Sequence, residues 1–390
     1  MIPLRVVTAA WPSPYAPFRA RLLQELHLAL GAGFPAEILA PRVHRDDPLD
    51  EERQGLRVRR FSYPTRGHGV RADGIGPIGA LRYLLSARAT ARRIWRPRGA
   101  AGPDSTEERG IVIGHWVVPT GWIAREVSRR LDWPLILYAH GSDLNRYGKG
   151  RVGRRLVQQA LRSARLVIAA SEPLAEEVRR LGPTGLRVEV LPIGVSSEFL
   201  SEETGTAAPM PDSAPPPLRV LFVGDRLPAK GADLLEEAAL RAIQRGATLS
   251  LTWIGDGPAD AEHTVGERRG PCGPKEIAAA MRDAHLLVLP SLSEGTPVVL
   301  QEAIACGLPW AATPVGGIPD LHRSYPGGLL LPDPSDRGAV IEALALLFLE
   351  RCQEGEGPAT RRRTAMLGER ASLSQSARAS RLAARIRAGA

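Results

Sequence analysis

Short, mainly apolar runs alternate with helical stretches along both halves of the chain. In the first half we predict strands at Leu4–Ala9, Ile111–Trp116, Leu135–Ala139, Leu166–Ala170 and Arg187–Leu191. In the second half we predict strands at Arg219–Val223, Ser250–Ile254, Leu286–Leu289 and Trp310–Ala312. Runs without polar alternation are typical of strands covered on both faces, and strands alternating with helices indicate βαβ units. The pattern therefore predicts two doubly wound α/β domains in tandem.

A proline-rich segment separates the two halves. Residues Ser201 to Pro217, SEETGTAAPMPDSAPPP, hold five prolines and almost no large apolar side chain. Such a composition is typical of a linker. We therefore predict a first domain over residues 1–200, a linker over 201–217 and a second domain over 218–370.

Composition and charge narrow the class of protein. A length of 390 residues and a mass of 42.0 kDa suit two domains, and no apolar run approaches the ~18 residues that span a bilayer. Three cysteines without a C-x-x-C spacing argue against a disulfide framework and a structural zinc site. Residues 1–200 hold 31 Lys and Arg against 19 Asp and Glu, while residues 201–390 hold 20 against 23. We expect a soluble, cytoplasmic protein whose halves face different partners, or whose first half faces an anionic partner.

Glycine and polar residues follow the predicted strands where each strand ends. These segments are His140-Gly141-Ser142-Asp143, Gly224 to Gly231, Gly255-Asp256 and Ser291 to Pro297. Open parallel sheets bind ligands at the carboxyl ends of their strands. The sequence therefore predicts a nucleotide site at these edges.

Two glutamates frame the start of a predicted helix. Glu294 ends a strand, Thr296 could cap the helix, Pro297 suits its first turn, and the helix continues from Val298 to Ala305. Free N–H groups at a helix start favour a phosphate, and Glu302 one turn further could accept hydrogen bonds from a ribose diol. On spacing alone, a loop charge at Glu294 and a solvated helix residue at Glu302 are the favoured interpretation, since two glutamates eight positions apart are a weak motif.

Candidate cations and a candidate histidine complete the site. Arg226 and Lys230 could neutralise a diphosphate leaving group without a metal, since the chain has no D-x-D motif. Two exposed loop charges are the alternative. His140 could contact a sugar or be a buried, hydrogen-bonded histidine, and Asp143 could be a turn or N-cap residue.

A helix predicted from Leu81 to Arg98 carries an unusual face. Its apolar positions and its arginines fall on nearly one side: Leu81, Leu84, Leu85, Trp95, Arg88, Arg92 and Arg96. Such a face suits an anionic membrane or a lipid-phosphate acceptor. An ordinary helix whose arginine stems cover core residues explains the pattern equally well.

Taken together, these motifs resemble the family-four glycosyltransferases, a retaining family with the GT-B fold. The E-x7-E segment is LLVLPSLSEGTPVVLQEAIACGLPWAATPVGGIPDL, and the similarity extends in order to HWVVPTG, LILYAHGSDL, ASEPLAEEVRRLG, VEVLPIGVSSEFL, FVGDRLPAKGADLL and WIGDGP. It covers residues 1 to about 350. The resemblance implies two Rossmann-like domains facing each other across a cleft, with residues 371–390 forming a helix that crosses back to the first domain.

The resemblance also implies roles for individual residues. It assigns catalysis to His140, Glu294, Arg226 and Lys230, and donor binding to Glu302, Gly295, Thr296, Pro297, Gly224, Gly255 and Asp256. Glu302 would hold the ribose, and Glu294 with the amides of Gly295 and Thr296 would hold the sugar and the diphosphate. Arg226 and Lys230 would stabilise the leaving diphosphate, and His140 would lie over the sugar. On the acceptor side we place Asp143, Arg88 and Arg92.

The implied activity is retaining transfer of a sugar from a nucleotide-sugar donor to a glycan or polyprenyl-linked acceptor. No metal or other cofactor and no nucleic acid is expected, and cell-surface polysaccharide synthesis at the inner face of the membrane is the expected setting. Where the family has Gly-Arg-Leu, this chain has Gly224-Asp225-Arg226, so the arginine is displaced by one position. The alternatives are a nucleotide-sugar epimerase of the same fold and a catalytically silent partner subunit, the second supported by that displacement.

Overall fold

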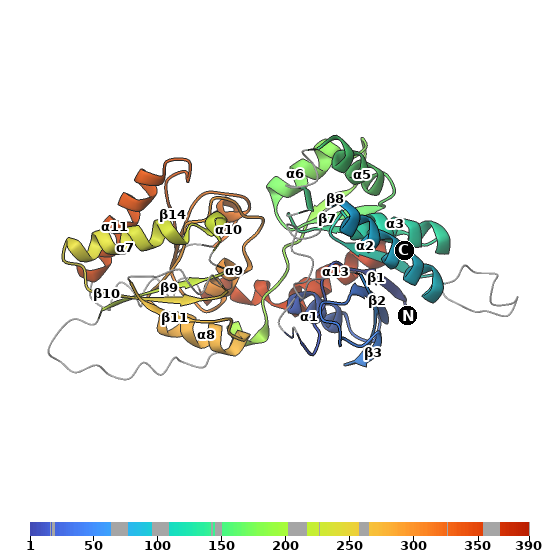
Figure 1. Ribbon diagram of the computed structural model, residues 1–390, viewed down its shortest axis with the longest axis horizontal. Coiled ribbons are helices and arrows are strands. Elements are labelled where there is room, and N and C mark those ends of the chain that lie inside the picture. Colours follow the sequence, from blue (N-terminus) through green and yellow to red (C-terminus); the bar gives the residue numbers. More distant parts are fainter. Residues whose placement is uncertain are drawn as a thin grey trace, which may run out of the picture. The chain divides into compact units, whose positions relative to one another are not determined.

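The protein is described by a computed structural model that divides into two compact units (Figure 1). The first unit is Met1–Ile193 with Arg378–Ala390, and the second is Gly194–Ala377. The structure describes the chain except for residues 16, 18, 19, 64–76, 96–108, 142, 145–149, 202–216, 226, 257–264, 326, 354–366 and 390.

The first unit is built on an eight-stranded sheet in the order β3-β4-β2-β1-β5-β6-β7-β8. Its strands are β1 (Leu4–Val7), β2 (Ala36–Pro41), β3 (Asp50–Arg53), β4 (Leu56–Phe61), β5 (Ile111–His115), β6 (Leu135–Ala139), β7 (Leu166–Ala169) and β8 (Val188–Val190). All neighbours pair in parallel except β3, which is antiparallel to β4. The order reverses between β1 and β5, which makes that point the topological switch of the sheet.

Helices cover both faces of the first sheet. They are α1 (Arg21–Leu30), α2 (Pro77–Ile94), α3 (Thr120–Leu131), α5 (Arg151–Leu161), α6 (Glu172–Leu181) and α13 (Gln375–Gly389). One core contains side chains of α2, α3, α5 and α6, and the other contains side chains of α1 and α13. Within β1, Val7 belongs to the first core and Val6 to the second, so the strand is buried on both faces.

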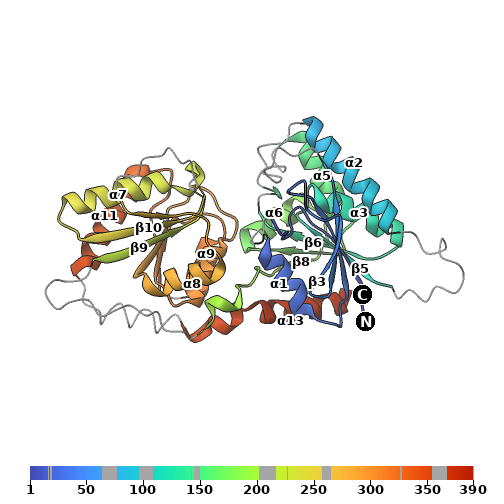
Figure 2. The same cartoon turned by 60° about the horizontal axis from the view of Figure 1, so that its bottom comes forward.

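The second unit has a six-stranded, all-parallel sheet in the order β11-β10-β9-β12-β13-β14. The strands are β9 (Leu218–Val223), β10 (Leu249–Ile254), β11 (Glu267–Arg269), β12 (Leu286–Leu289), β13 (Trp310–Ala312) and β14 (Gly328–Leu330). The helices are α7 (Ala232–Gln244), α8 (Pro274–Asp283), α9 (Val298–Ala305), α10 (Ile318–Ser324) and α11 (Arg337–Gln353). Figure 2 shows α7 and α11 on one face and α8 and α9 on the other.

The predicted fold class is confirmed, and each of the nine predicted strands is present within a few residues of its predicted limits. Five strands were missed, namely β2, β3, β4, β11 and β14. Four of these carry charged residues, as in AEILAP of β2, DEER of β3, LRVRRF of β4 and ERR of β11, so a search for mainly apolar runs passes over the last three. In the part of the chain that is described, no helix combines the length and apolar character needed to cross a bilayer.

The boundary between the units lies earlier than predicted. The first unit ends at Ile193 rather than at residue 200, because Val195 and Phe199 are buried in the core of the second unit. Val195 N–H also donates to the Leu373 carbonyl at 2.8 Å. At the other end of the chain, the first unit takes up α13 from Arg378 onward, and its core includes Ala379, Leu382, Ala383 and Ile386.

Candidate functional site

The first candidate site lies at the topological switch of the second sheet, between β9 and β12. Lys230 follows β9, Glu294 follows β12, and Lys230 Nζ lies 2.7 Å from Glu294 Oε1. Ser291 Oγ donates to the same carboxylate oxygen at 2.7 Å. Leu292 N–H donates to the Ala229 carbonyl at 2.9 Å, which joins the two loops through the backbone. Two residues 64 positions apart are therefore held together where open parallel sheets bind ligands.

The lysine and the glutamate of this pair differ in exposure. The side chain of Glu294 is 7% exposed, whereas that of Lys230 is 30% exposed. The buried carboxylate therefore has its charge balanced within the protein. The ammonium keeps a solvent-facing side from which it can contact an anionic ligand.

Two glycines allow the backbone around Glu294 to pack closely. Gly231 has φ +65°, and a Cβ there would lie 2.0 Å from the Pro290 carbonyl oxygen. Gly316 has φ +57°, and its Cβ would lie 2.3 Å from the Glu294 carbonyl oxygen. Both positions require a residue without a side chain, in conformation as well as in space. The loop that carries Glu294 is therefore fixed by its neighbours.

Gly224 and Gly255 end the adjacent strands β9 and β10. Gly224 N–H donates to the Ile254 carbonyl at 2.9 Å, and a Cβ on Gly255 would lie 2.2 Å from the Gly224 carbonyl oxygen. Asp256 follows and is exposed. Arg226, the displaced arginine, lies outside the described residues. Among the residues that are described, no group of three His, Cys, Asp or Glu side chains is arranged to hold a metal ion.

Helix α9 begins next to this loop, as the sequence predicted. Its first residue is Val298, Pro297 occupies the N-cap position, and no side chain caps it. The prediction that Thr296 caps the helix is therefore wrong, since the loop enters α9 through the extended backbone of Pro297 (ψ 118°). Glu302 lies one turn into α9 and is partly exposed, as are Gly295 and Thr296. The structure thus places Glu294, Thr296 and Glu302 around one helix start.

A chain of three histidines lies at the carboxyl edge of the first sheet. His115 ends β5, His140 follows β6, and His27 lies on α1. His27 Nε2 is 3.0 Å from His115 Nε2, and His115 Nδ1 is 3.2 Å from His140 Nε2. Of these three, only His140 was predicted from the sequence. The other two stand within the apolar runs RLLQELHLAL and IVIGH, and no pattern marks them as chemical residues.

Aromatic rings enclose these histidines. The ring of Tyr138 stacks on both His115 and His140, with centroids 5.4 and 4.9 Å away, and the ring of Trp116 lies 4.6 Å from His140. Burial lowers the pKa of His27 to about 4 and that of His140 to about 3. Burial first, and the neighbouring histidines second, also lower the pKa of His115. All three rings are therefore neutral at pH 7.

Asp143 is buried and holds the loop after β6. Its Oδ2 accepts the Val117 N–H at 2.7 Å, and its Oδ1 accepts the Gly141 N–H at 2.9 Å. Burial raises the pKa of this carboxyl group, and the backbone hydrogen bonds oppose that rise. Both oxygens have backbone partners, which is the turn-forming role considered in the sequence analysis.

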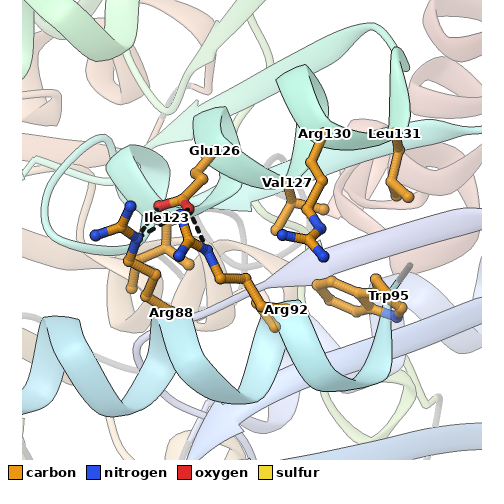
Figure 3. A pocket seen from close by; sticks show the side chains of 9 residues that line it. Arg88, Arg92, Trp95, Ile123, Glu126, Val127, Arg130 and Leu131 are labelled. Atoms are coloured by element: carbon orange, nitrogen blue, oxygen red, sulfur yellow. Dashed lines mark hydrogen bonds and ion pairs between the residues drawn. The ribbon is translucent and has the colours of Figure 1, made fainter. Parts of the chain in front are cut away.

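Arg88 and Arg92 line a small pocket between α2 and α3. Figure 3 shows both pointing from α2 to Glu126 of α3, and their Nε atoms lie 2.8 and 2.7 Å from Glu126 Oε1. Burial would raise the pKa of Glu126, but the hydrogen bonds and charges of the two arginines lower it. Arg130 and Trp95 line the other end of the pocket. The arginines therefore link two helices of the first unit.

The apolar face predicted for this helix is only partly right. Trp95 is buried and Leu84 partly buried, but Leu81 and Leu85 are 57% and 53% exposed. The core face consists of Tyr83, Ala87, Ala91 and Trp95, since the two alanines let the backbone approach the sheet. Ile78, 71% exposed, continues the exposed apolar row. Arg96 lies outside the described residues.

The folds of known proteins match this architecture along the whole chain. Sucrose-phosphate synthase of Thermosynechococcus elongatus superposes with a TM-score of 0.74 at 17% identity, covering 100% of this chain and 99% of that one. HepE of Anabaena, solved in complex with UDP-glucose, gives a TM-score of 0.68 at 16% identity, covering 100% of both chains. The fold is therefore that of the GT-B glycosyltransferases.

Family models identify the protein family of the chain. The model "Glycosyl transferase 4-like domain" matches residues 15–194, and "Glycosyl transferases group 1" matches residues 217–349. Together they account for most of the chain, which belongs to the family-four glycosyltransferases.

Curated relatives carry names from polysaccharide and glycoside synthesis. TuaC of Bacillus subtilis, named for teichuronic acid biosynthesis, is 33% identical over 242 residues, which are 60% of this chain and 60% of TuaC. The D-inositol 3-phosphate glycosyltransferase of Streptomyces bingchenggensis is 32% identical over 48% of this chain and 47% of its own. AmsK of Erwinia amylovora, named for amylovoran biosynthesis, is 26% identical over 56% of this chain and 54% of its own. The matched segments thus span about half to three fifths of these relatives.

Proposed function

We propose that the protein transfers a sugar, with retention of anomeric configuration, from a nucleotide-diphosphate sugar to a glycan or polyprenyl-linked acceptor in cell-surface polysaccharide synthesis. The Lys230–Glu294 pair at the switch point of the second sheet carries this proposal. The names of TuaC and AmsK support the polysaccharide setting, and the UDP-glucose complex of HepE supports the donor class.

The donor is proposed to bind along the carboxyl edge of the second sheet. Glu302 accepts hydrogen bonds from the ribose, and the amides at the start of α9 contact the diphosphate. Glu294 holds the transferred sugar, and Lys230 faces the diphosphate with its exposed side. Gly224, Gly255 and Asp256 shape the neighbouring strand ends, and the displaced Arg226 adds a second cation.

The proposed reaction exchanges one bond at the anomeric carbon for another. The bond from that carbon to the β-phosphate oxygen breaks, and a bond to the acceptor oxygen forms on the same face. The proton of the acceptor hydroxyl passes to the departing phosphate oxygen. Lys230 stabilises the negative charge as it grows on the diphosphate, so the reaction needs no metal ion.

We further propose that α2 brings the protein to an anionic membrane surface on the cytoplasmic side. Ile78, Leu81 and Leu85 form an exposed apolar row, and α2 contains four arginines and no acidic residue. A helix with exposed apolar residues beside cations is typical of proteins that lie on anionic lipid. This surface would meet a lipid-linked acceptor where it is embedded.

A thermal-shift screen against UDP-, GDP-, ADP- and dTDP-sugars, followed by a transfer assay on the donor it selects, tests the proposal. One nucleotide sugar should raise the melting temperature, and added polyprenyl phosphate or glycan acceptor should then be glycosylated. Conversion of the donor to an epimeric sugar without any acceptor would favour the epimerase. Donor binding without turnover under any acceptor would favour the silent partner subunit.

A further inference from the structure

We propose that His27 and His115 are positioning residues that fix His140 as a neutral hydrogen-bond donor through its Nδ1–H. The inference deepens the proposed function, on which it rests, and it takes the contact between His140 and the transferred sugar from the family resemblance. The chain of rings on which it stands is independent of that assignment. It spans three elements, namely α1, the end of β5 and the segment after β6.

Only two proton arrangements satisfy both contacts of the chain when the rings are neutral. A neutral imidazole has one N–H and one bare nitrogen. In one arrangement His27 Nε2–H donates to His115 Nε2, His115 Nδ1–H donates to His140 Nε2, and His140 has its proton on Nδ1. In the other, both bonds reverse, His140 carries its proton on Nε2, and His27 carries its proton on Nδ1.

The surroundings of His27 favour the first arrangement. Its Nδ1 is buried and has no hydrogen-bond partner among the described residues. A proton there would be a buried donor without an acceptor, which is rarer and costlier than a bare acceptor nitrogen. The indole Nε1–H of Trp11 is also buried without a partner, and its ring lies 5.9 Å from that of His27. An indole has a donor and no acceptor nitrogen, so Trp11 offers no acceptor for a proton on His27.

Among the described residues, no charged group contributes to the pKa of any of the three histidines, so none favours the reversed proton arrangement. The hydroxyl of Tyr138 donates to the Leu191 carbonyl, and both oxygens of Asp143 accept backbone N–H groups. The charge of Arg378 lowers the pKa of Tyr138, against the larger effect of burial. Burial keeps all three rings neutral.

His140 consequently presents a donor rather than a base. Its Nε2 accepts from His115, so this nitrogen cannot receive a proton from a substrate hydroxyl. Its Nδ1–H can donate to a sugar oxygen. Trp116, which lies against His140, has φ +66° at the end of β5, a strained conformation of the kind that clusters at functional sites.

The direct test is the tautomeric state of each ring, measured by long-range ¹H–¹⁵N correlation on the ¹⁵N-histidine-labelled full chain at pH 7. Protonated and bare ring nitrogens differ widely in ¹⁵N shift, and single His→Gln variants assign the signals. We expect protons on His27 Nε2, His115 Nδ1 and His140 Nδ1. A proton on His27 Nδ1 or on His140 Nε2 would overturn the inference, whether or not the enzyme is active.

The second test asks whether the order matters for turnover. His27→Phe removes the first donor and frees the other two rings to reverse, so His140 should become a mixture of tautomers and kcat should fall about fivefold to tenfold at unchanged donor KM. His27→Gln keeps an N–H donor and should restore kcat and the Nδ1–H state. The control is His44→Phe, at a histidine that is not one of these three and whose side chain is 40% exposed. Equal kcat loss in the Phe and Gln variants, or loss without a change of tautomer, would reduce His27 to a packing residue.

Discussion

At the scale of single residues, the two candidate edges use charge in different ways. Glu294 and Lys230 form a charged pair whose lysine stays accessible. The three histidines are neutral, with His27 and His115 buried and His140 partly exposed. The sequence identified Glu294, Lys230 and His140 because each follows a strand. His27 and His115 could not be found, since a histidine within an apolar run is most often a core residue and only the fold brings them together.

Lys230→Ala should lower kcat by about ten- to a thousandfold with a smaller effect on donor KM, because the charge on the diphosphate is greatest in the transition state. Steady-state kinetics on the donor found by screening measure this. Lys275→Ala, which removes an exposed lysine of the same unit, is the matched control and should be neutral. Equal kinetics of the Lys230 variant and the parent would remove Lys230 from the leaving-group site.

Glu302→Ala should weaken binding of the free nucleotide by roughly 1.5–3 kcal/mol, the range for hydrogen bonds to a charged group. Isothermal titration calorimetry measures the change, and Glu276→Ala on α8 is a control at a different helix start. Unchanged affinity would show that Glu302 does not hold the ribose.

His27 should make the first unit acid-labile. Burial lowers its pKa from 6.5 to about 4, so between these pH values the unfolded chain binds a proton that the folded chain does not. The free energy of unfolding therefore falls as the pH drops through this window, by about 1.4 kcal/mol per pH unit for one proton. Urea unfolding of His27→Gln at pH 7, 5.5 and 4.5 should show a slope shallower by about that amount than the parent. Parallel slopes for His27→Gln and the parent would contradict the buried neutral state.

At the scale of elements, strands and helices were predictable where one pattern decided them. Helix α9 has the limits expected from the sequence, Val298 to Ala305, because a proline and a run of apolar residues mark both its start and its course. Helix α2 shows the opposite case. Its leucines look like core residues in the sequence, but Tyr83 and two alanines form the core face, and Leu81 and Leu85 are exposed. Which of two apolar stripes meets a sheet depends on how closely the backbones approach.

Replacing Leu81 and Leu85 by Ser should reduce binding to vesicles of anionic lipid, because these side chains are free to enter the interface. Co-sedimentation with vesicles containing phosphatidylserine measures the loss. Arg88→Gln with Arg92→Gln is the comparison, and it should lose less binding than the leucine variant because Glu126 already engages both arginines. Undiminished sedimentation of the leucine variant would end the membrane proposal for α2.

At the scale of the whole molecule, two Rossmann-like units were predictable from the alternation of apolar runs and helices, and the GT-B fold from the order of the motifs. The unit boundary was not, because Pro-rich composition marks residues 201–217, whereas the packing of Val195 and Phe199 sets the division at Gly194. In the second unit the strand order reverses between β9 and β12, and Lys230 and Glu294 lie at that point. The sheet topology thus brings together residues that are far apart in the sequence.

The most direct test of the account is the product of a single reaction, followed by ¹H NMR with the screened donor and acceptor in the presence of EDTA. An α-linked nucleotide sugar should give an α-linked product, at a rate that EDTA leaves unchanged. A β-linked product, or a rate that EDTA abolishes and manganese restores, would contradict it.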